Sequence, residues 1–84
     1  MTSLANAPRV LIVDDEAEMC ELAAESLRSR GYAASWKRVP AEALAALDEQ
    51  EYSALLVDIN MEEMTGLELC RCALEKQPDL PVIV

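Results

Sequence analysis

Two short apolar runs that each end in aspartate constrain the fold of this chain more than any other feature. The first, Arg9-Val10-Leu11-Ile12-Val13, is followed by Asp14-Asp15, and the second, Ser53-Ala54-Leu55-Leu56-Val57, is followed by Asp58. An unbroken apolar run of this length is typical of a strand that is buried on both faces of a sheet. Because open α/β sheets place their sites at the carboxyl ends of parallel strands, we expect these three acids to gather there.

Two helices are expected between these runs. The first starts near Glu16 and stops at Gly31, a residue typical of the position just past a helix end. The second starts at Pro40, which suits a first helical turn, and reaches about Gln50. The expected apolar stripes are Cys20, Ala23, Ala24 and Leu27 in the first helix and Ala43, Leu44 and Leu47 in the second. The weaker run Tyr32–Lys37 lies between these helices and predicts an edge strand.

A third helix and a fourth strand are expected after the second run. Thr65 and Glu68 fit a capping box, so the third helix is expected to begin there and to stop before Pro78. Its expected apolar stripe is Leu67, Cys70 and Leu74. Pro81 then introduces the short run Val82-Ile83-Val84. Because strands and helices alternate, right-handed crossovers predict an α/β fold with a doubly wound parallel sheet.

The charge balance narrows the possible partners of the chain. The formal net charge is −9, from 16 acidic and 7 basic residues, and there is no histidine. This balance argues against direct contact with nucleic acid, because phosphate binding needs clustered Lys and Arg. An acidic excess around the three aspartates instead favours a cation such as Mg²⁺. No apolar stretch is long enough to span a membrane.

The three cysteines, Cys20, Cys70 and Cys72, are an odd number in a chain that carries no secretion signal. This points to reduced thiols and a cytoplasmic protein. Cys20 and Cys70 fall on apolar helix stripes, so both are interpreted as small core residues. Residues 1–7 are expected to be a flexible leader, which leaves residues 8–84 as the folded domain.

The acidic motifs resemble those of the response-regulator receiver domains of two-component signalling. The resemblance is carried by Asp14-Asp15-Glu, by the segment Asp58-Ile-Asn-Met-Glu-Glu-Met-Thr-Gly66, and by the run Pro78-Asp-Leu-Pro-Val-Ile-Val84. The chain is most similar to the receivers that are attached to sigma-54-dependent AAA+ activators. The resemblance implies a flavodoxin-like sheet with strand order 2-1-3-4. It also implies a cytoplasmic phosphoacceptor domain that is not an enzyme and that controls an output domain in transcription regulation.

The resemblance also implies a role for each residue of the motif. Asp58 would accept a phosphoryl group from a sensor histidine kinase and would take part in a Mg²⁺ site. Asp15 would bind the metal directly and Asp14 mainly through water, while the backbone carbonyl of Asn60 would supply a further ligand. Glu62 stands where the family usually has proline, which is expected to alter phosphorylation rates more than the fold.

Parts of the family's pattern would lie beyond Val84. These are a Ser or Thr after the fourth strand, a Lys at the end of the fifth strand, that strand itself and two helices. The chain is therefore expected to be a C-terminally truncated receiver. Because the missing hydroxyl and Lys grip the phosphoryl group in the family, we expect the chain to take up phosphoryl groups poorly. We also expect it to form a homodimer or a swapped dimer through its bare fourth strand.

Simpler interpretations of the same residues exist. Asp14 and Asp15 could cap the first helix, and Asp58 could be an ordinary carboxylate at a strand end. At matching strand ends the three together favour a metal and phosphoryl site. Two other functions remain: an interaction or dimerisation module that is not phosphorylated, and an aspartate-based phosphatase. The phosphatase is disfavoured because such enzymes usually carry Asp-x-Asp at the end of the first strand, whereas Asp14 and Asp15 are adjacent.

Overall fold

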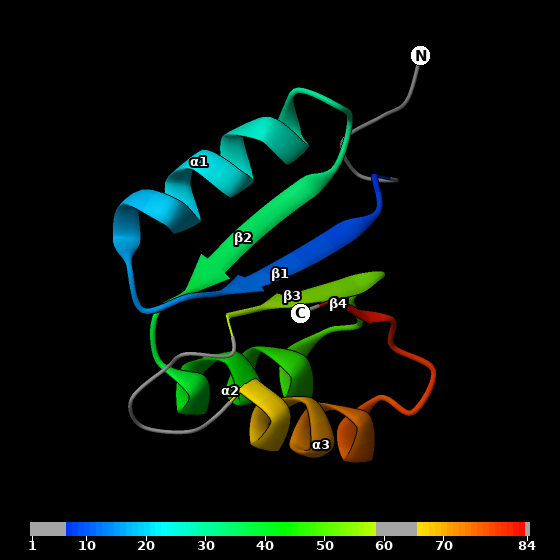
Figure 1. Ribbon diagram of the computed structural model, residues 1–84. Helices are drawn as coiled ribbons and strands as arrows, with labels where there is room; N and C mark the ends of the chain where they lie inside the picture. Colours follow the sequence, from blue (N-terminus) through cyan, green and yellow to red (C-terminus); the bar gives the residue numbers. More distant parts are fainter. Residues whose placement is uncertain (1–6, 59–65, 84) are drawn as a thin grey trace.

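Parallel strands form the centre of the molecule (Figure 1). The computed structural model describes residues 7–58 and 66–83. Its strands are β1 (Arg9–Val13), β2 (Ala33–Lys37), β3 (Ala54–Val57) and β4 (Val82–Ile83). They form one sheet in the order β2-β1-β3-β4, and all three pairings are parallel. The predicted α/β fold, strand order and edge position of β2 are therefore confirmed.

Three helices in the described residues lie against the two faces of this sheet. They are α1 (Ala17–Arg28), α2 (Pro40–Glu49) and α3 (Gly66–Lys76). Helix α1 lies over one face, and α2 and α3 lie over the other (Figure 1). The described residues contain no helix that is both long and apolar enough to cross a membrane.

Side chains that alternate along the strands build a core on each face of the sheet. Leu11 and Leu55 point toward α2 and α3 and are fully buried, whereas Val10 and Ile12 point toward α1. Residues of a strand alternate between the two sides of a sheet, so an unbroken apolar run supplies both cores at once. This is why the two apolar runs occupy the central strands β1 and β3.

Gly31 ends the first helix as expected. Its φ angle is 94°, a backbone conformation that residues with a Cβ rarely adopt. The Gly31 N–H donates to the Arg28 carbonyl at 3.1 Å, and the Tyr32 N–H donates to the Leu27 carbonyl at 3.1 Å. This pair of hydrogen bonds is typical of a Schellman motif, which closes a helix and reverses the chain. The chain can then enter β2 directly.

The stripe predicted for α3 was wrong. Leu67 and Leu74 are exposed to 72% and 42%, whereas Leu69 and Ala73 are fully buried. The helix therefore packs with its 69/73 face against the core, and only Cys70 of the predicted stripe is partly buried there. Thr65, the other half of the predicted capping box, lies outside the described residues.

The side chain of Gln77 joins the ends of α2 and α3 to the start of β3. Its Nε2 donates to the carbonyls of Leu47 at 2.8 Å and Gln50 at 3.0 Å, and its Oε1 accepts from the Tyr52 N–H at 3.2 Å. One amide thus satisfies three backbone groups where helix α2 gives way to the next strand. This holds the end of the sheet opposite Asp14 and Asp58.

Candidate metal centre

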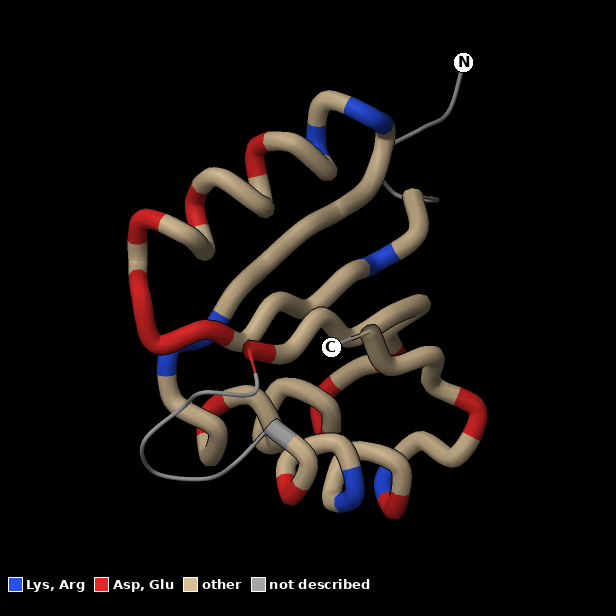
Figure 2. The backbone as a smooth tube through the Cα atoms, viewed as in Figure 1, with Lys and Arg blue, Asp and Glu red and all other residues tan. Residues whose placement is uncertain are grey.

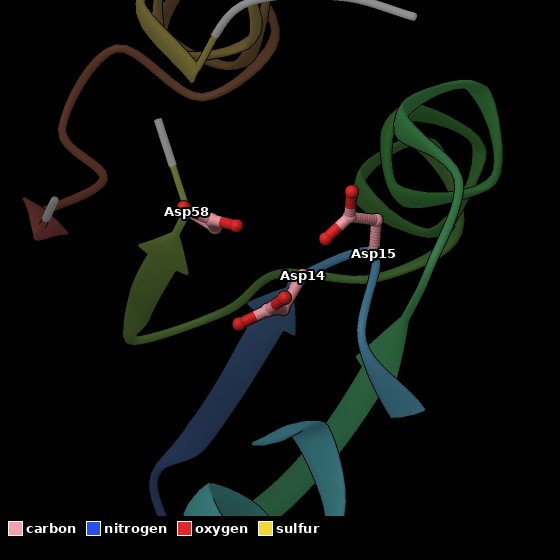
Figure 3. Close-up of side chains that lie close together, drawn as sticks. All are labelled: Asp14, Asp15 and Asp58. Atoms are coloured by element: carbon pink, nitrogen blue, oxygen red, sulfur yellow. The ribbon is translucent and has the colours of Figure 1, made fainter. Parts of the chain in front are cut away.

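The three aspartates singled out from the sequence lie together at the carboxyl edge of the sheet. One carboxylate oxygen from each of Asp14, Asp15 and Asp58 can be chosen so that all lie within 4.8 Å of one another. The side chains converge from two segments of the chain (Figure 3). All three are half-buried, so they face the same partly desolvated space. The predicted clustering of the acids is confirmed.

The pairing of β1 with β3 creates this cluster. Val13 and Val57 are partners in the parallel register, and the next residue of each strand is an aspartate. The Asp58 N–H donates to the Val13 carbonyl at 2.9 Å, so the backbone ladder continues to the phosphoacceptor candidate itself. Asp58 therefore owes its position to ordinary sheet hydrogen bonding.

The turn that carries Asp14 and Asp15 is fixed by its own hydrogen bonds. Asp14 Oδ1 accepts from the Glu16 N–H at 3.0 Å, an Asx-type turn. The first residue of α1 is Ala17 and its N-cap is Glu16, which makes no side-chain capping bond. Neither Asp14 nor Asp15 is therefore the N-cap of α1. Acidic residues fill this turn (Figure 2).

Two side chains from elsewhere hold the backbone carbonyls of the acidic pair. Cys20 Sγ donates to the Asp14 carbonyl at 3.2 Å, and Arg38 Nε donates to the Asp15 carbonyl at 3.1 Å. The sequence pattern predicts a core position for Cys20 and gives no signal for Arg38. A side chain that acts on a backbone carbonyl leaves no motif, because the carbonyl is the same in every residue.

Cys20 is fully buried and carries a free thiol, as do the partly buried Cys70 and Cys72. Burial raises the pKa of the Cys20 thiol, and the negative charge of Asp14 raises it further. Burial also raises the pKa of Cys70. The predicted core role of Cys20 is confirmed, and Cys70 packs against the core while partly buried.

An open cavity of about 620 Å³ adjoins the aspartates. Its polar end is formed by Asp14, Asp15, Glu16 and Asp58, and its apolar lining includes Met19 and Ile83. The carboxylates are therefore accessible to a small phosphorylated group or to an ion. Asn60 and Glu62, the remaining site residues predicted from the sequence, lie outside the described residues.

The donor set suits Mg²⁺. This ion takes oxygen ligands at about 2.0–2.1 Å in an octahedron, so two oxygens bound directly to it lie at most about 4.2 Å apart. The oxygens of the three carboxylates lie within 4.8 Å of one another, close to that limit. Small side-chain rotations or one bridging water bring the set into range. Repulsion among three carboxylates further favours a bound cation.

Comparison with known proteins agrees with this geometry. Residues 10–84 match the protein family described as "Response regulator receiver domain". The response regulator receiver protein CpdR of Brucella abortus is 37% identical over 75 residues, which are 89% of this chain and 62% of CpdR. The response regulator MprA of Mycobacterium avium is 34% identical over 76 residues, which are 90% of this chain but 33% of MprA. The chain thus spans only part of these relatives.

A solved structure with the same fold is the response regulator TrrA of Thermotoga maritima in complex with Mg²⁺-BeF. It superposes with a TM-score of 0.86 and 32% identity, over 92% of this chain and 67% of that one. TrrA has also been crystallised with the histidine kinase ThkA, and that structure superposes with a TM-score of 0.83 over 89% of this chain and 65% of that one.

Proposed function

The chain belongs to the response regulator receiver domains, phosphoacceptor signalling modules rather than enzymes, and from this membership we propose that Asp58 accepts a phosphoryl group beside a Mg²⁺ ion. Asp14, Asp15 and Asp58 would hold the metal, together with the backbone carbonyl of Asn60. The observation that carries the proposal is the convergence of three carboxylates at the ends of β1 and β3.

Asp58 has the chemistry of a phosphoryl acceptor. Its carboxylate oxygen would attack the phosphorus of a phosphohistidine, so that an O–P bond forms and the P–N bond breaks. The electron pair stays on the imidazole nitrogen, which takes up a proton. Such a transfer depends mostly on position and on charge neutralisation, and the positive charge for the latter would come from Mg²⁺.

The remaining residues of the site orient the reactants. The Asp58 N–H, bonded to the Val13 carbonyl at 2.9 Å, fixes the acceptor at the sheet edge. Asp14 and Asp15 place two further carboxylates beside it, and the open cavity admits the donor. Asp58 thus combines access with a fixed backbone, which is what in-line attack on a bulky partner requires.

A sensor histidine kinase is the proposed donor of the phosphoryl group. The crystal structure of TrrA with the kinase ThkA supports this choice, since TrrA and this chain share the receiver fold. A cytoplasmic location, control of an output domain in transcription regulation, and an origin in a sigma-54-dependent activator are further parts of the proposal. They rest on the resemblance of the acidic motifs.

Titration calorimetry with Mg²⁺ tests the metal site. We expect Asp15→Asn and Asp58→Asn each to weaken Mg²⁺ binding by about tenfold or more, because a ligand charge is lost at constant shape. Asp48→Asn is the matched control, since Asp48 makes an exposed ion pair with Lys76 at 2.8 Å away from the cluster. Equal affinity in all four proteins would refute the metal site.

Fluoroberyllate tests the acceptor role of Asp58, because its tetrahedral shape resembles that of a phosphoryl group. In ¹⁹F NMR we expect a bound signal that requires Mg²⁺ and disappears in Asp58→Asn. A small phosphodonor should give a hydroxylamine-labile adduct on the same residue in intact-mass spectra, in low yield as predicted from the sequence. An adduct that persists in Asp58→Asn would rule out Asp58 as acceptor, and a high yield would contradict the expected poor uptake.

A further inference from the structure

We propose that Arg38 is a positioning residue for the metal ligand Asp15. This inference rests on the proposed function, because it assigns a role within the Mg²⁺ site. Arg38 touches neither the metal nor the reacting atoms in this assignment. It acts through the backbone of the acidic turn.

The attachment of the acidic turn to the end of β2 carries the inference. The Asp14 N–H donates to the Lys37 carbonyl at 3.3 Å, at the last residue of β2. The next residue, Arg38, donates from Nε to the Asp15 carbonyl at 3.1 Å. The last residue of β2 and the residue after it therefore contact the two residues that follow β1. Of these two contacts, the one from Arg38 acts on Asp15 itself.

Asp15 has few other means of being held. The Asp14 carboxylate is oriented by the Glu16 N–H and its carbonyl by Cys20, and Asp58 is held by the strand ladder. For Asp15, the described residues give a single hydrogen bond to its backbone or side chain, which is the one from Arg38. Loss of that bond frees the peptide that carries the carboxylate.

Arg38 affects Mg²⁺ binding in two opposite ways. Its hydrogen bond pre-orients a ligand and strengthens binding, whereas its positive charge repels the cation and weakens binding. The Arg38 side chain is exposed, so its charge is screened by water and by salt, with a Debye length of about 8 Å at physiological ionic strength. Groups that orient metal ligands change affinity by about 10–100-fold when removed. Positioning therefore outweighs repulsion.

Three substitutions at this position separate the hydrogen bond from the charge. Arg38→Met keeps an apolar stem but removes both, Arg38→Gln keeps an N–H donor without charge, and Arg38→Lys keeps both. In Mg²⁺ calorimetry at physiological ionic strength we expect Arg38→Met to raise the Kd by about tenfold. Arg38→Lys and Arg38→Gln are expected to restore most of the affinity. Arg30→Met is the matched control, because Arg30 is an exposed arginine in the turn after α1.

Two results of the Mg²⁺ binding measurement would overturn the inference. Tighter binding in both Arg38→Met and Arg38→Gln would mean that Arg38 acts by repulsion, and unchanged binding in Arg38→Met would mean that it plays no part. Thermal unfolding without metal checks that all variants are folded, and an exposed side chain should leave it nearly unchanged. If the wild-type chain binds no Mg²⁺, the proposed function itself fails. If the wild-type chain binds Mg²⁺ and Arg38→Met binds it equally well, the role of Arg38 is refuted but the proposed metal site is not.

Discussion

At the scale of single residues, Cys20 connects the core to the acidic site. Its side chain is fully buried on the inner side of α1, and its thiol donates to the Asp14 carbonyl at 3.2 Å. Burial, and then the charge of Asp14, raise its pKa, so the folded protein holds the thiol proton more tightly than the unfolded chain does. The stabilisation that results is complete below the ordinary thiol pKa and is lost as the pH rises toward the raised value.

Cys20→Ala should therefore destabilise the protein in a pH-dependent way. At neutral pH we expect the free energy of unfolding to fall by about 1–2 kcal/mol, because packing contacts and the hydrogen bond from the thiol to the Asp14 carbonyl are lost. The difference in the free energy of unfolding between the two proteins should shrink above the ordinary thiol pKa, because deprotonation of the buried thiol destabilises the wild-type protein. Urea denaturation of both proteins across neutral and alkaline pH measures this. A difference that stays constant with pH would contradict a raised Cys20 pKa.

At the scale of elements, α3 shows what sequence pattern leaves open. The helix carries two apolar stripes: Leu67, Cys70 and Leu74 on one side, and Leu69 and Ala73 on another. Both have helical spacing, so periodicity identifies the helix but does not select the face that meets the sheet. The choice depends on how the helix packs against α2 and β3, which is a tertiary effect.

Substitutions of two leucines test this orientation of α3. Leu69→Ala should lower the free energy of unfolding by about 2–5 kcal/mol, because it opens a cavity in a fully buried position. Leu67→Ala, at a side chain that is 72% exposed, should change it by about 0.5 kcal/mol or less. Chemical denaturation gives both values. The reverse order would restore the orientation predicted from the sequence.

At the scale of the whole molecule, most of the architecture was predictable. The apolar runs of β1 and β3 and the start at Pro40 identify elements whose bounds differ from the prediction by about one residue, whereas α1 ends at Arg28, earlier than the predicted stop at Gly31. The acidic cluster was predictable as well, because parallel strands bring their carboxyl ends to one edge. The supporting contacts of Arg38 and Gln77 were not, since they join segments distant in sequence through backbone groups that carry no residue-specific signal.

One face of the sheet is incompletely covered in the described part of the chain. Helix α1 lies over β2 and β1, while Ile83 on the edge strand β4 is 56% exposed and shares a cavity with Met19, which is 51% exposed. Parallel sheets are normally covered on both faces, and an exposed apolar edge strand favours pairing with a second chain. We therefore propose that the 84-residue chain self-associates through this face and the β4 edge.

Sedimentation velocity over a range of concentrations tests this association. Wild-type chain should show concentration-dependent dimers or larger species, and Ile83→Lys should shift them toward monomer by placing a charge on the edge. Leu67→Lys adds the same charge at an exposed leucine on α3, which covers the other face of the sheet, and should leave the association unchanged. A monomeric wild-type chain with cooperative unfolding would contradict the proposal.

The register that pairs Val13 with Val57 makes the acidic site a property of the folded state alone. When heat separates β1 from β3, Asp58 moves away from Asp14 and Asp15, and the three carboxylates can no longer bind one cation together. Mg²⁺ should then act as a thermal stabiliser, contributing about 2.7 kcal/mol at one hundred times its Kd. The melting temperature would rise with Mg²⁺ in wild type and would rise less in Asp15→Asn, whose affinity is lower. Calorimetric melting could thus report occupancy of the centre without a kinase or an output domain present.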